Sequence, residues 1–322
     1  MKKNQIGDIP EFASYLKVKP STLFMYDKFQ CGHDGYGSIV KERNQFKISL
    51  RPLMTSVKDQ RQNLTCVSFA AIGAFEYIVY ALADDPFRDV EPDLSESHIT
   101  HAIEKLHGDC VGGLSIVELA YYLRYNGCVE ETSWPYNEHE ICSANPPNLA
   151  LARRYLTDVI TDTSIGPAFI HREHDEVIAR IKLQIRGITK SFRTSNIVEM
   201  CCTHLSQYRR PVVVDVPVFW SKDDFSAGWE IGVIEMPTPN QLKSWLTQTS
   251  KDVSGSSGWH AICLTGYNEG RRRFEFKNSW GKNWGFSGYG TIPFEYLDSY
   301  SRDCWRIGAT YSTMVGPPNF GV

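Results

Sequence analysis

The stretch from Cys66 to Ala83 constrains the fold more than any other part of the sequence, because nearly all of its positions are apolar. A helix that is apolar on every side has to be covered on every side. The stretch is at the short limit for a membrane span and contains Glu76, Ser68 and Gly73, so it predicts a buried helix of a globular protein. A chain of 322 residues is long enough to cover such a helix with one large domain or two packed ones.

Around this helix the sequence divides into a helical half and a β half. Further helices are predicted to begin near Ser95, Ser115 and Asp175. After Pro211 the sequence consists mainly of short runs of β-forming residues, which are separated by turns rich in Gly, Asn and Ser. These runs are 212–216, 260–265 and 273–277. The pattern predicts an α+β fold with a mostly antiparallel sheet and a cleft where the two halves meet.

The same pattern gives a domain organisation. Residues 47–195 are interpreted as a helical lobe with an insertion near 150–195, and residues 196–322 as a β lobe. Residues 1–46 are interpreted as an N-terminal extension, either a short regulatory segment or a pro-segment. The segment 221–257 is expected to be a long loop.

Charge excludes one class of function. The chain has 34 basic and 37 acidic side chains and a pI near 6.3, whereas a general nucleic-acid binder needs a basic surface to neutralise phosphates. We therefore expect no nucleic-acid partner and, with no membrane span predicted, no membrane partner. The first residues, Met1–Asp8, are not followed by the apolar run of a secretory signal, which predicts a protein without an export signal.

Three residues far apart in the sequence suggest nucleophilic chemistry. Cys66 lies at the first turn of the buried helix, where the helix dipole is expected to lower the pKa of the thiol and favour the thiolate. A thiolate nucleophile needs a histidine to exchange protons with it, and that histidine needs an acceptor to hold its ring. A hairpin turning at 268–272 would bring His260 and Asn278 together. The backbone N–H of Cys66 and the side-chain amide of Gln60 could stabilise an oxyanion.

Four sequence blocks resemble papain-like cysteine peptidases (peptidase family C1), including bacterial members. The first, residues 50–69, has the lead-in LRP followed by VKDQ, and then Cys66 and Phe69. The second is GDCVGG at 108–113, and the third is GWHA at 258–261 followed by Gly266-Tyr267. The fourth is KNSWGKNWGFSGYG at 277–290. The blocks occur in the family order over residues 48–295.

The resemblance implies the two-lobed papain-like fold and assigns residue roles. Cys66 would be the nucleophile, His260 the general base and acid, Asn278 the residue that orients the imidazole, and Gln60 an oxyanion donor. Trp280 would shield the His–Asn hydrogen bond. The substrate-binding residues would be Gly112, Gly113, Leu114, Asp215 and Trp280. No cofactor or metal is implied.

Some positions depart from the family pattern. Asn63 stands where the family has a structural cysteine, and Val67 where it has tryptophan, so Cys110 has no disulfide partner in the usual place. Leu64 and Thr65 are bulkier than the usual Gly-Ser, which could narrow the cleft. Asp215 either selects basic side chains in the pocket for the second residue before the cleaved bond, or makes a hydrogen bond inside the lobe.

The remaining groups of histidine and cysteine residues are interpreted as structural or solvent-exposed residues and not as metal ligands. The groups His98, His101, His107, Cys110 and His171, His174, Asp175 lack closed zinc spacing, and histidines at helical spacing are typical of a solvated face. Adjacent Cys201 and Cys202 fall in a predicted helix and suggest core packing, with redox sensitivity as the alternative.

The function predicted is hydrolysis of peptide bonds through a Cys66 thioester. The alternatives are a peptide ligase or transferase that uses the same acyl-enzyme, and a catalytically impaired binding protein. The expected partners are a protein or peptide substrate and a regulatory partner or inhibitor; the sequence predicts no oligomeric state. Nine cysteines without the usual pairings and the sequon Asn63-Leu64-Thr65 beside the nucleophile favour a cytoplasmic protein, or one delivered into a host cell without a signal peptide.

Overall fold

The fold is seen in a computed structural model that describes most of the chain between residues 40 and 315. The described residues are 40–42, 45–82, 91–107, 114, 116–137, 147–149, 154–155, 169–171, 174–186, 197–219, 228–249, 258–306 and 314–315. The helices are α2 (Cys66–Leu82), α3 (Glu96–His107), α4 (Ile116–Asn126), α5 (His174–Ile185), α6 (Ile197–Gln207), α7 (Pro239–Thr249) and α8 (Phe294–Tyr300), with short 3₁₀ turns at Arg51–Leu53 and Glu131–Ser133. The strands are β1 (Val40–Glu42), β2 (Gln45–Ser49), β3 (Cys128–Val129), β4 (Arg154–Tyr155), β5 (Phe169–His171), β6 (Val212–Pro217), β7 (Trp259–Asn268), β8 (Arg273–Lys277), β9 (Tyr289–Pro293), β10 (Asp303–Arg306) and β11 (Met314–Val315).

An eight-stranded sheet forms one half of the molecule. Its order is β1-β2-β7-β6-β10-β5, with β8 and β9 continuing from β7, and every pairing between its strands is antiparallel. A second sheet of three short strands, β11-β4-β3, lies apart from it. The strands β7 and β8 form the predicted hairpin, in which Asn268 pairs with Arg273. The α+β prediction is confirmed, and so is the antiparallel sheet.

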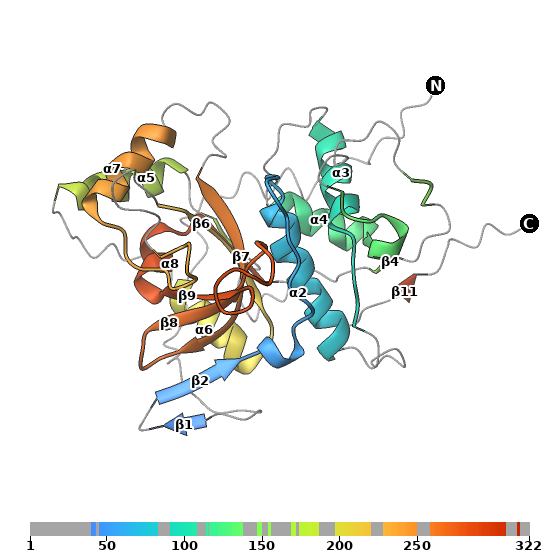
Figure 1. The fold of residues 1–322 in the computed structure, drawn as a ribbon, viewed down its shortest axis with the longest axis horizontal. Coiled ribbons are helices and arrows are strands. Elements are labelled where there is room, and N and C mark those ends of the chain that lie inside the picture. The colour runs from blue at the N-terminus through green and yellow to red at the C-terminus, as the bar shows by residue number, and fades with distance from the viewer. Residues whose placement is uncertain are drawn as a thin grey trace, which may run out of the picture.

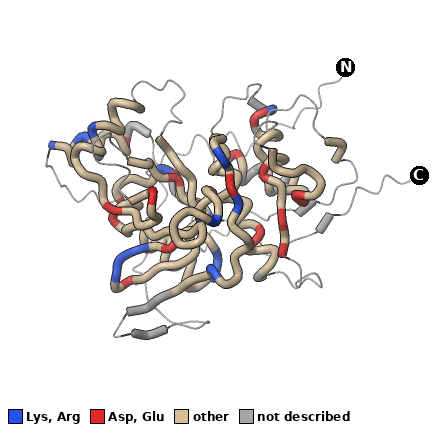
Figure 2. The backbone as a smooth tube through the Cα atoms, viewed as in Figure 1, with Lys and Arg blue, Asp and Glu red and all other residues tan. Residues whose placement is uncertain are grey.

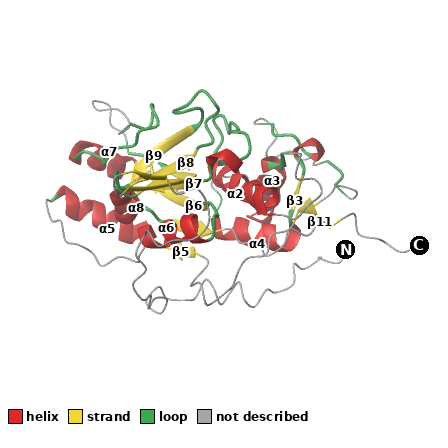
Figure 3. Ribbon diagram, turned by 90° about the horizontal axis from the view of Figure 1, so that it is seen from below, coloured by secondary structure: helices red, strands yellow, loops and turns green. Residues whose placement is uncertain are grey.

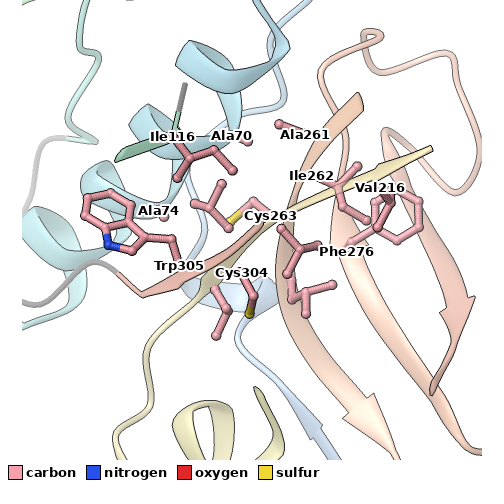
Figure 4. Close-up of a cluster of buried hydrophobic side chains, with 14 of the residues drawn as sticks. Ala70, Ala74, Ile116, Val216, Ala261, Ile262, Cys263, Phe276, Cys304 and Trp305 are labelled. Carbon is pink, nitrogen blue, oxygen red and sulfur yellow. The ribbon is translucent and has the colours of Figure 1, made fainter. Parts of the chain in front are cut away.

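Helix α2 separates the two halves of the molecule. It lies between the large sheet on one side and α3 and α4 on the other, while α5, α7 and α8 lie at the far end of the sheet (Figures 1 and 3). Residues 67–79 of α2 are all buried. Because burying one large aliphatic or aromatic side chain stabilises a fold by about 1.5–3 kcal/mol, this helix contributes heavily to the core. Side chains of α2, the sheet and α4 meet in one continuous cluster (Figure 4).

The close approach of β2 to β7 depends on a glycine. A Cβ on Gly266 would lie 2.2 Å from the carbonyl oxygen of Ile48 and 2.9 Å from the Cα of Ser49. No side chain fits at such distances, so only glycine lets β2 cross this part of β7. The pairing of Ser49 with Gly266 thereby fixes where the chain leaves the sheet before it enters the loop that leads to Cys66.

The chain joins the sheet earlier than the predicted lobe boundary at residue 196. Strand β5 pairs with β10, and Arg180 of α5 donates a hydrogen bond to the carbonyl oxygen of Asp298 at 3.4 Å. Strand β2, near the start of the predicted helical lobe, pairs with β7. The predicted boundary was placed where short β-type runs begin to dominate the sequence. Strands that lie before this boundary also pair with the large sheet.

The predicted loop 221–257 contains a helix, α7. Its start is capped in both directions: the backbone N–H of Gln241 donates to Thr238 Oγ1 at 3.3 Å, and the N–H of Thr238 donates to Gln241 Oε1 at 2.9 Å. This is a capping box, with Pro239 at the first helical position. The sequence signal Thr-Pro-Asn-Gln was therefore present, but the surrounding polar residues obscured it.

Charged residues of both signs are interspersed along the described chain (Figure 2). None of the helices in the part of the chain that the structure describes has the length and hydrophobicity needed to cross a membrane.

Candidate active site

Cys66 is the first residue of α2, as predicted. Its side chain is partly exposed, whereas Val67 and Phe69 behind it are buried. The backbone N–H of Ala261 on β7 donates a hydrogen bond to the thiol, so the thiol faces β7. The helix therefore brings the sulfur to the strand that also carries His260.

His260 and Asn278 meet across the β7–β8 hairpin. The His260 Nε2 and Asn278 Oδ1 atoms lie 2.7 Å apart, and both residues are buried. The backbone N–H of Ser279 also donates to Asn278 Oδ1, at 2.9 Å, which fixes this atom as the amide oxygen. Nε2 of His260 must then be the protonated nitrogen, and Nδ1 is left to accept a proton.

Two tryptophans enclose the imidazole of His260. The Trp280 ring stacks on it with centroids 4.6 Å apart and an interplanar angle of 28°, and Trp229 meets it edge-on at 5.8 Å. Trp229 is only 1% exposed and is held by Trp284, whose Nε1 donates to the Trp229 carbonyl oxygen at 2.6 Å. Trp229 was not predicted from the sequence, because it lies in the segment 221–257, which was interpreted as a long loop.

Gln60 is fixed on both sides of its amide. Its Oε1 accepts a hydrogen bond from Ser279 Oγ at 2.5 Å, and its Nε2 donates to the Asn63 carbonyl oxygen at 2.6 Å. The backbone N–H of Gln60 donates to the Ser279 carbonyl oxygen at 2.8 Å. These contacts join the loop before Cys66 to the residue that follows Asn278, and leave the second Nε2 hydrogen of Gln60 for another acceptor.

Tyr136 supports the same loop and was not foreseen from the sequence. Its hydroxyl donates to the Gln60 carbonyl oxygen at 2.8 Å and lies 3.1 Å from Thr65 Oγ1. Thr65 is buried, so its side chain is not part of the cleft wall. Leu64, by contrast, is 51% exposed. Of the two bulky residues before the nucleophile, only Leu64 is placed to narrow the cleft.

Replacing Tyr136 by phenylalanine is expected to lower kcat/KM about fivefold. The variant loses the hydroxyl that positions the Gln60–Thr65 loop, and one net hydrogen bond contributes about 1 kcal/mol. The matched control is Tyr300→Phe, which loses a hydroxyl bonded to Gln184 at 2.6 Å on α5. Both variants should lose similar stability in urea unfolding, but only Tyr136→Phe should lose activity; equal activities would contradict a positioning role.

Burial governs the protonation of the pair. It raises the pKa of the Cys66 thiol to about 11, against the lowering effect of the Ala261 hydrogen bond. It also lowers the pKa of His260 to about 4, against the raising effect of the Asn278 hydrogen bond. The expected helix-dipole lowering of the thiol pKa is thus outweighed, because the low-dielectric cleft disfavours both charged forms. Both shifts favour the neutral forms, a thiol and an imidazole.

Asp215 forms an internal ion pair. It is 3% exposed, and Arg302 donates to its carboxylate through Nη2. The guanidinium of Arg302 also lies over the Trp259 ring, 4.5 Å from the centroid. Burial raises the pKa of Asp215 to about 6, although Arg302 opposes the shift. This geometry favours the second of the two expectations for Asp215, a contact inside the lobe.

The remaining predicted binding residues are only partly described. Leu114 is 6% exposed and belongs to the core cluster. Gly112 and Gly113 lie outside the described residues.

A buried ionic cluster lies behind the site. Glu76, 0% exposed, accepts hydrogen bonds from Thr55 Oγ1 at 2.5 Å, Lys58 Nζ at 2.9 Å and the Leu94 backbone N–H at 2.8 Å. Lys58 Nζ also lies 3.0 Å from Glu96 Oε1. Thr55 Oγ1 in turn accepts from Lys277, the residue before Asn278, at 3.0 Å. The cluster therefore links both halves of the molecule directly beneath the site.

This cluster explains why a carboxylate occurs in the most apolar helix of the chain. A cavity of about 10 Å³ lies among its members, large enough for about one water molecule and too small for a substrate.

The histidines considered for metal sites are placed differently from each other. His98 is 3% exposed and packs against Tyr122 and Trp134, at 5.8 and 5.9 Å between centroids, so the expectation of a solvated face is wrong for it. Among the residues that the structure describes, no group of three or more His, Cys, Asp or Glu side chains could hold a metal ion. Cys110 lies outside the described residues.

Comparisons with known proteins agree with this geometry. The family described as papain family cysteine protease matches residues 43–162 and 240–300, more than half of the chain. The fold is similar to that of xylellain, a cysteine protease from Xylella fastidiosa, with a TM-score of 0.56 and 19% identity over 89% of this chain and 96% of xylellain.

One curated relative also matches. It is a peptidase C1-like protein of Acanthamoeba polyphaga mimivirus, 23% identical over 142 residues, which are 42% of this chain and 46% of that protein. The match thus spans less than half of the relative's length. The family match, which covers both the Cys66 helix and the β7–β8 hairpin, rests on more of the chain: this protein belongs to the papain family of cysteine proteases.

Proposed function

We propose that this chain is a cysteine-type peptidase that hydrolyses peptide bonds of protein or peptide substrates. The observation that carries the proposal is the convergence of three residues: Cys66 starts α2 against β7, and His260 on β7 is hydrogen-bonded to Asn278 at 2.7 Å. These are the nucleophile, base and orienting group that a thiol acyl-transfer site needs.

The geometry accounts for each step. His260 Nδ1 takes the proton of the Cys66 thiol as the sulfur attacks the substrate carbonyl, while Asn278 holds the ring in the required tautomer. The Cys66 backbone N–H and the Gln60 side-chain amide donate to the oxyanion. His260 then gives its proton to the leaving amine, and water hydrolyses the thioester. Trp280 and Trp229 exclude bulk water from the His260–Asn278 hydrogen bond.

Neither alternative function is favoured over hydrolysis. A ligase or transferase would use the same residues and would need an amine to outcompete water for the thioester. A catalytically impaired binding protein was considered because of the residues next to Cys66, but Thr65 is turned toward Tyr136 and so does not obstruct the thiol.

We also propose a reducing compartment, either the cytoplasm or the interior of a host cell. The six cysteines that the structure describes form no disulfide. The sequon residue Asn63 lies three positions before the nucleophile, and its side chain contacts Tyr136 at 3.4 Å. A glycan at Asn63 would crowd the site.

The proposed function is tested with an irreversible thiol-directed epoxide. The protein is incubated with the epoxide, and the modified residue is located by mass spectrometry. We expect one adduct on Cys66, together with loss of hydrolysis of a mixed peptide library. Product analysis with an added amine separates hydrolysis from transfer. Absence of an adduct on Cys66, or of cleavage by the untreated protein, would refute the proposal.

The pH dependence of kcat/KM should show an acid limb near pH 4. Because the pKa of His260 is lowered to about 4, the imidazole stays neutral above that pH and becomes protonated, and unable to accept the thiol proton, below it. The Cys66 pKa of about 11 places the alkaline limb well above neutrality.

Asp215→Asn serves as the control, because burial raises the pKa of Asp215 to about 6. An inflection near pH 6 that is absent from this variant belongs to Asp215. An acid limb at or above pH 6 that persists in the variant would contradict the neutral resting state.

A further inference from the structure

Two buried sulfur atoms meet between α6 and the large sheet. Cys201 Sγ and Cys304 Sγ lie 3.4 Å apart although 103 positions separate them in the sequence, and both residues are 0% exposed. Neither belongs to the active site described above. A disulfide bond is about 2.05 Å long, so each sulfur would have to move only about 0.7 Å to form one.

The secondary structure holds both cysteines in place. Cys304 is on β10, in register with Val214 of β6 and Ile170 of β5. It stands next to Trp305 in the interior (Figure 4). Successive side chains of a strand point to opposite faces, so Cys304 and Trp305 lie on different sides of the sheet, and Cys304 is on the side of α6. The sulfur–sulfur contact therefore depends on the register of β10 with its neighbouring strands and on the packing of α6 against the sheet.

The other buried cysteines have surroundings that differ from those of the Cys201–Cys304 pair. Cys202 is rotated by about 100° from Cys201 around the helix axis, because an α-helix has 3.6 residues per turn. Cys263 lies on β7, among the residues of the cavity beneath the active site, with Lys277 as its charged neighbour.

We propose that Cys201 and Cys304 are an oxidisable dithiol, a modification site for low-molecular-weight disulfides such as oxidised glutathione. One cysteine thiolate attacks a sulfur of the oxidant, releasing one reduced glutathione and forming a mixed disulfide. The second cysteine displaces the other glutathione and closes the Cys201–Cys304 bond. The two protein thiols are oxidised, one glutathione disulfide is reduced to two thiols, and the two protein protons end on those thiols.

Access to this site requires local opening, because both sulfurs are buried. The strand that flanks β10 on its outer side is β5, which has three residues and ends the sheet. Short edge strands open more readily than central ones. In a reducing compartment the pair stays a dithiol, and on transfer to an oxidising one it closes and joins α6 covalently to the sheet.

The bond should stabilise the fold. It would close a loop of about 100 residues in the unfolded chain, a constraint that favours the native state. We expect the oxidised protein to melt about 5–10 °C higher than the reduced protein. Dithiothreitol should reverse the shift.

The test uses the full chain in the Cys66→Ala background, so that the nucleophile forms no mixed disulfide. The protein is equilibrated with mixtures of oxidised and reduced glutathione, acid-quenched, alkylated and digested without reduction. Mass spectrometry should find the peptide pair containing Cys201 and Cys304, 2 Da lighter than the two free thiols. Cys304→Ser should lose both the cross-link and the Tm shift, whereas the matched control Cys202→Ser should keep both.

Mapping the disulfide needs only the Cys66→Ala protein, so the proposal stays open to refutation even if Cys304→Ser fails to fold. Recovery of Cys201 and Cys304 as alkylated thiols after equilibration in oxidised glutathione alone would overturn it. Stable glutathione adducts on either residue, or a cross-link of Cys304 to Cys202 or Cys263, would overturn it as well. None of these readouts depends on peptidase activity.

Discussion

Replacing Cys66 by alanine is expected to reduce peptide hydrolysis by at least about 10⁴-fold. Removing a catalytic nucleophile leaves only the contribution of binding and of the oxyanion donors, which do not form the acyl-enzyme. The measurement is kcat/KM for a peptide that the unmodified protein cleaves. Because Cys66 is partly exposed at the start of α2, the substitution should change the melting temperature very little.

The matched control is Cys128→Ser. Cys128 is buried on β3, and its Sγ donates to the Ser95 carbonyl oxygen at 3.3 Å, a hydrogen bond that a serine hydroxyl can also make. This variant should retain activity, which shows that loss of an arbitrary cysteine is not enough. Hydrolysis by Cys66→Ala within tenfold of the unmodified rate would exclude Cys66 as the nucleophile.

Replacing Lys58 by methionine is expected to lower the free energy of unfolding by about 3 kcal/mol at pH 9.5. Lys58 Nζ lies 2.9 and 3.0 Å from the buried carboxylates of Glu76 and Glu96, and 2.7 Å from the more exposed carboxylate of Asp93. Burial alone would lower the pKa of Lys58, but these carboxylates raise it above its usual value, so the lysine stays charged. Removing one partner of a buried ion pair leaves the others uncompensated, which costs about 3–5 kcal/mol; the partial exposure of Lys58 places the effect at the lower end.

The loss should depend on pH. Burial already raises the pKa of Glu96 to about 8 while Lys58 opposes the shift, so without Lys58 the folded state prefers a protonated carboxyl still more strongly. Such a group stabilises the fold below its unfolded pKa, near 4.5, and loses that contribution as pH rises toward the folded value. In the unmodified protein this loss ends near pH 8, whereas in the variant it continues to higher pH, so the variant should be less destabilised at pH 6 than at pH 9.5.

Urea unfolding at the two pH values measures the effect of Lys58→Met. Lys105, exposed on α3, provides the control, since Lys105→Met should change the stability by no more than about 0.5 kcal/mol. Equal losses for Lys58→Met at pH 6 and pH 9.5 would show that the cluster is not an ionic network.

Much of the site was predictable because its signals are local. The nearly all-apolar stretch from Cys66 to Ala83 predicts a buried helix, and α2 begins at Cys66 as expected. The turn residues near 270 predict a hairpin, and that hairpin joins His260 to Asn278. Both features depend on periodicity and turn chemistry within about 20 residues, which a sequence shows directly.

Other parts could not be predicted, because their partners lie far apart in the sequence. Trp229, which encloses His260, and Tyr136, which supports Gln60, have no local pattern that marks them. The protonation state of Cys66 depends on how deeply the two halves bury it, and this depth reversed the expected direction of its pKa shift.

The sequence by itself determined the α+β class, the buried helix, the catalytic hairpin and the family resemblance, since each follows from short-range patterns. Only the tertiary structure decided that Asp215 pairs with Arg302, that Glu76 meets Lys58 beneath the site, and that Cys201 touches Cys304. These contacts depend on strand register and helix docking. A shift of one residue in β10 would turn Cys304 to the opposite face of the sheet, and no local pattern in the sequence specifies that register.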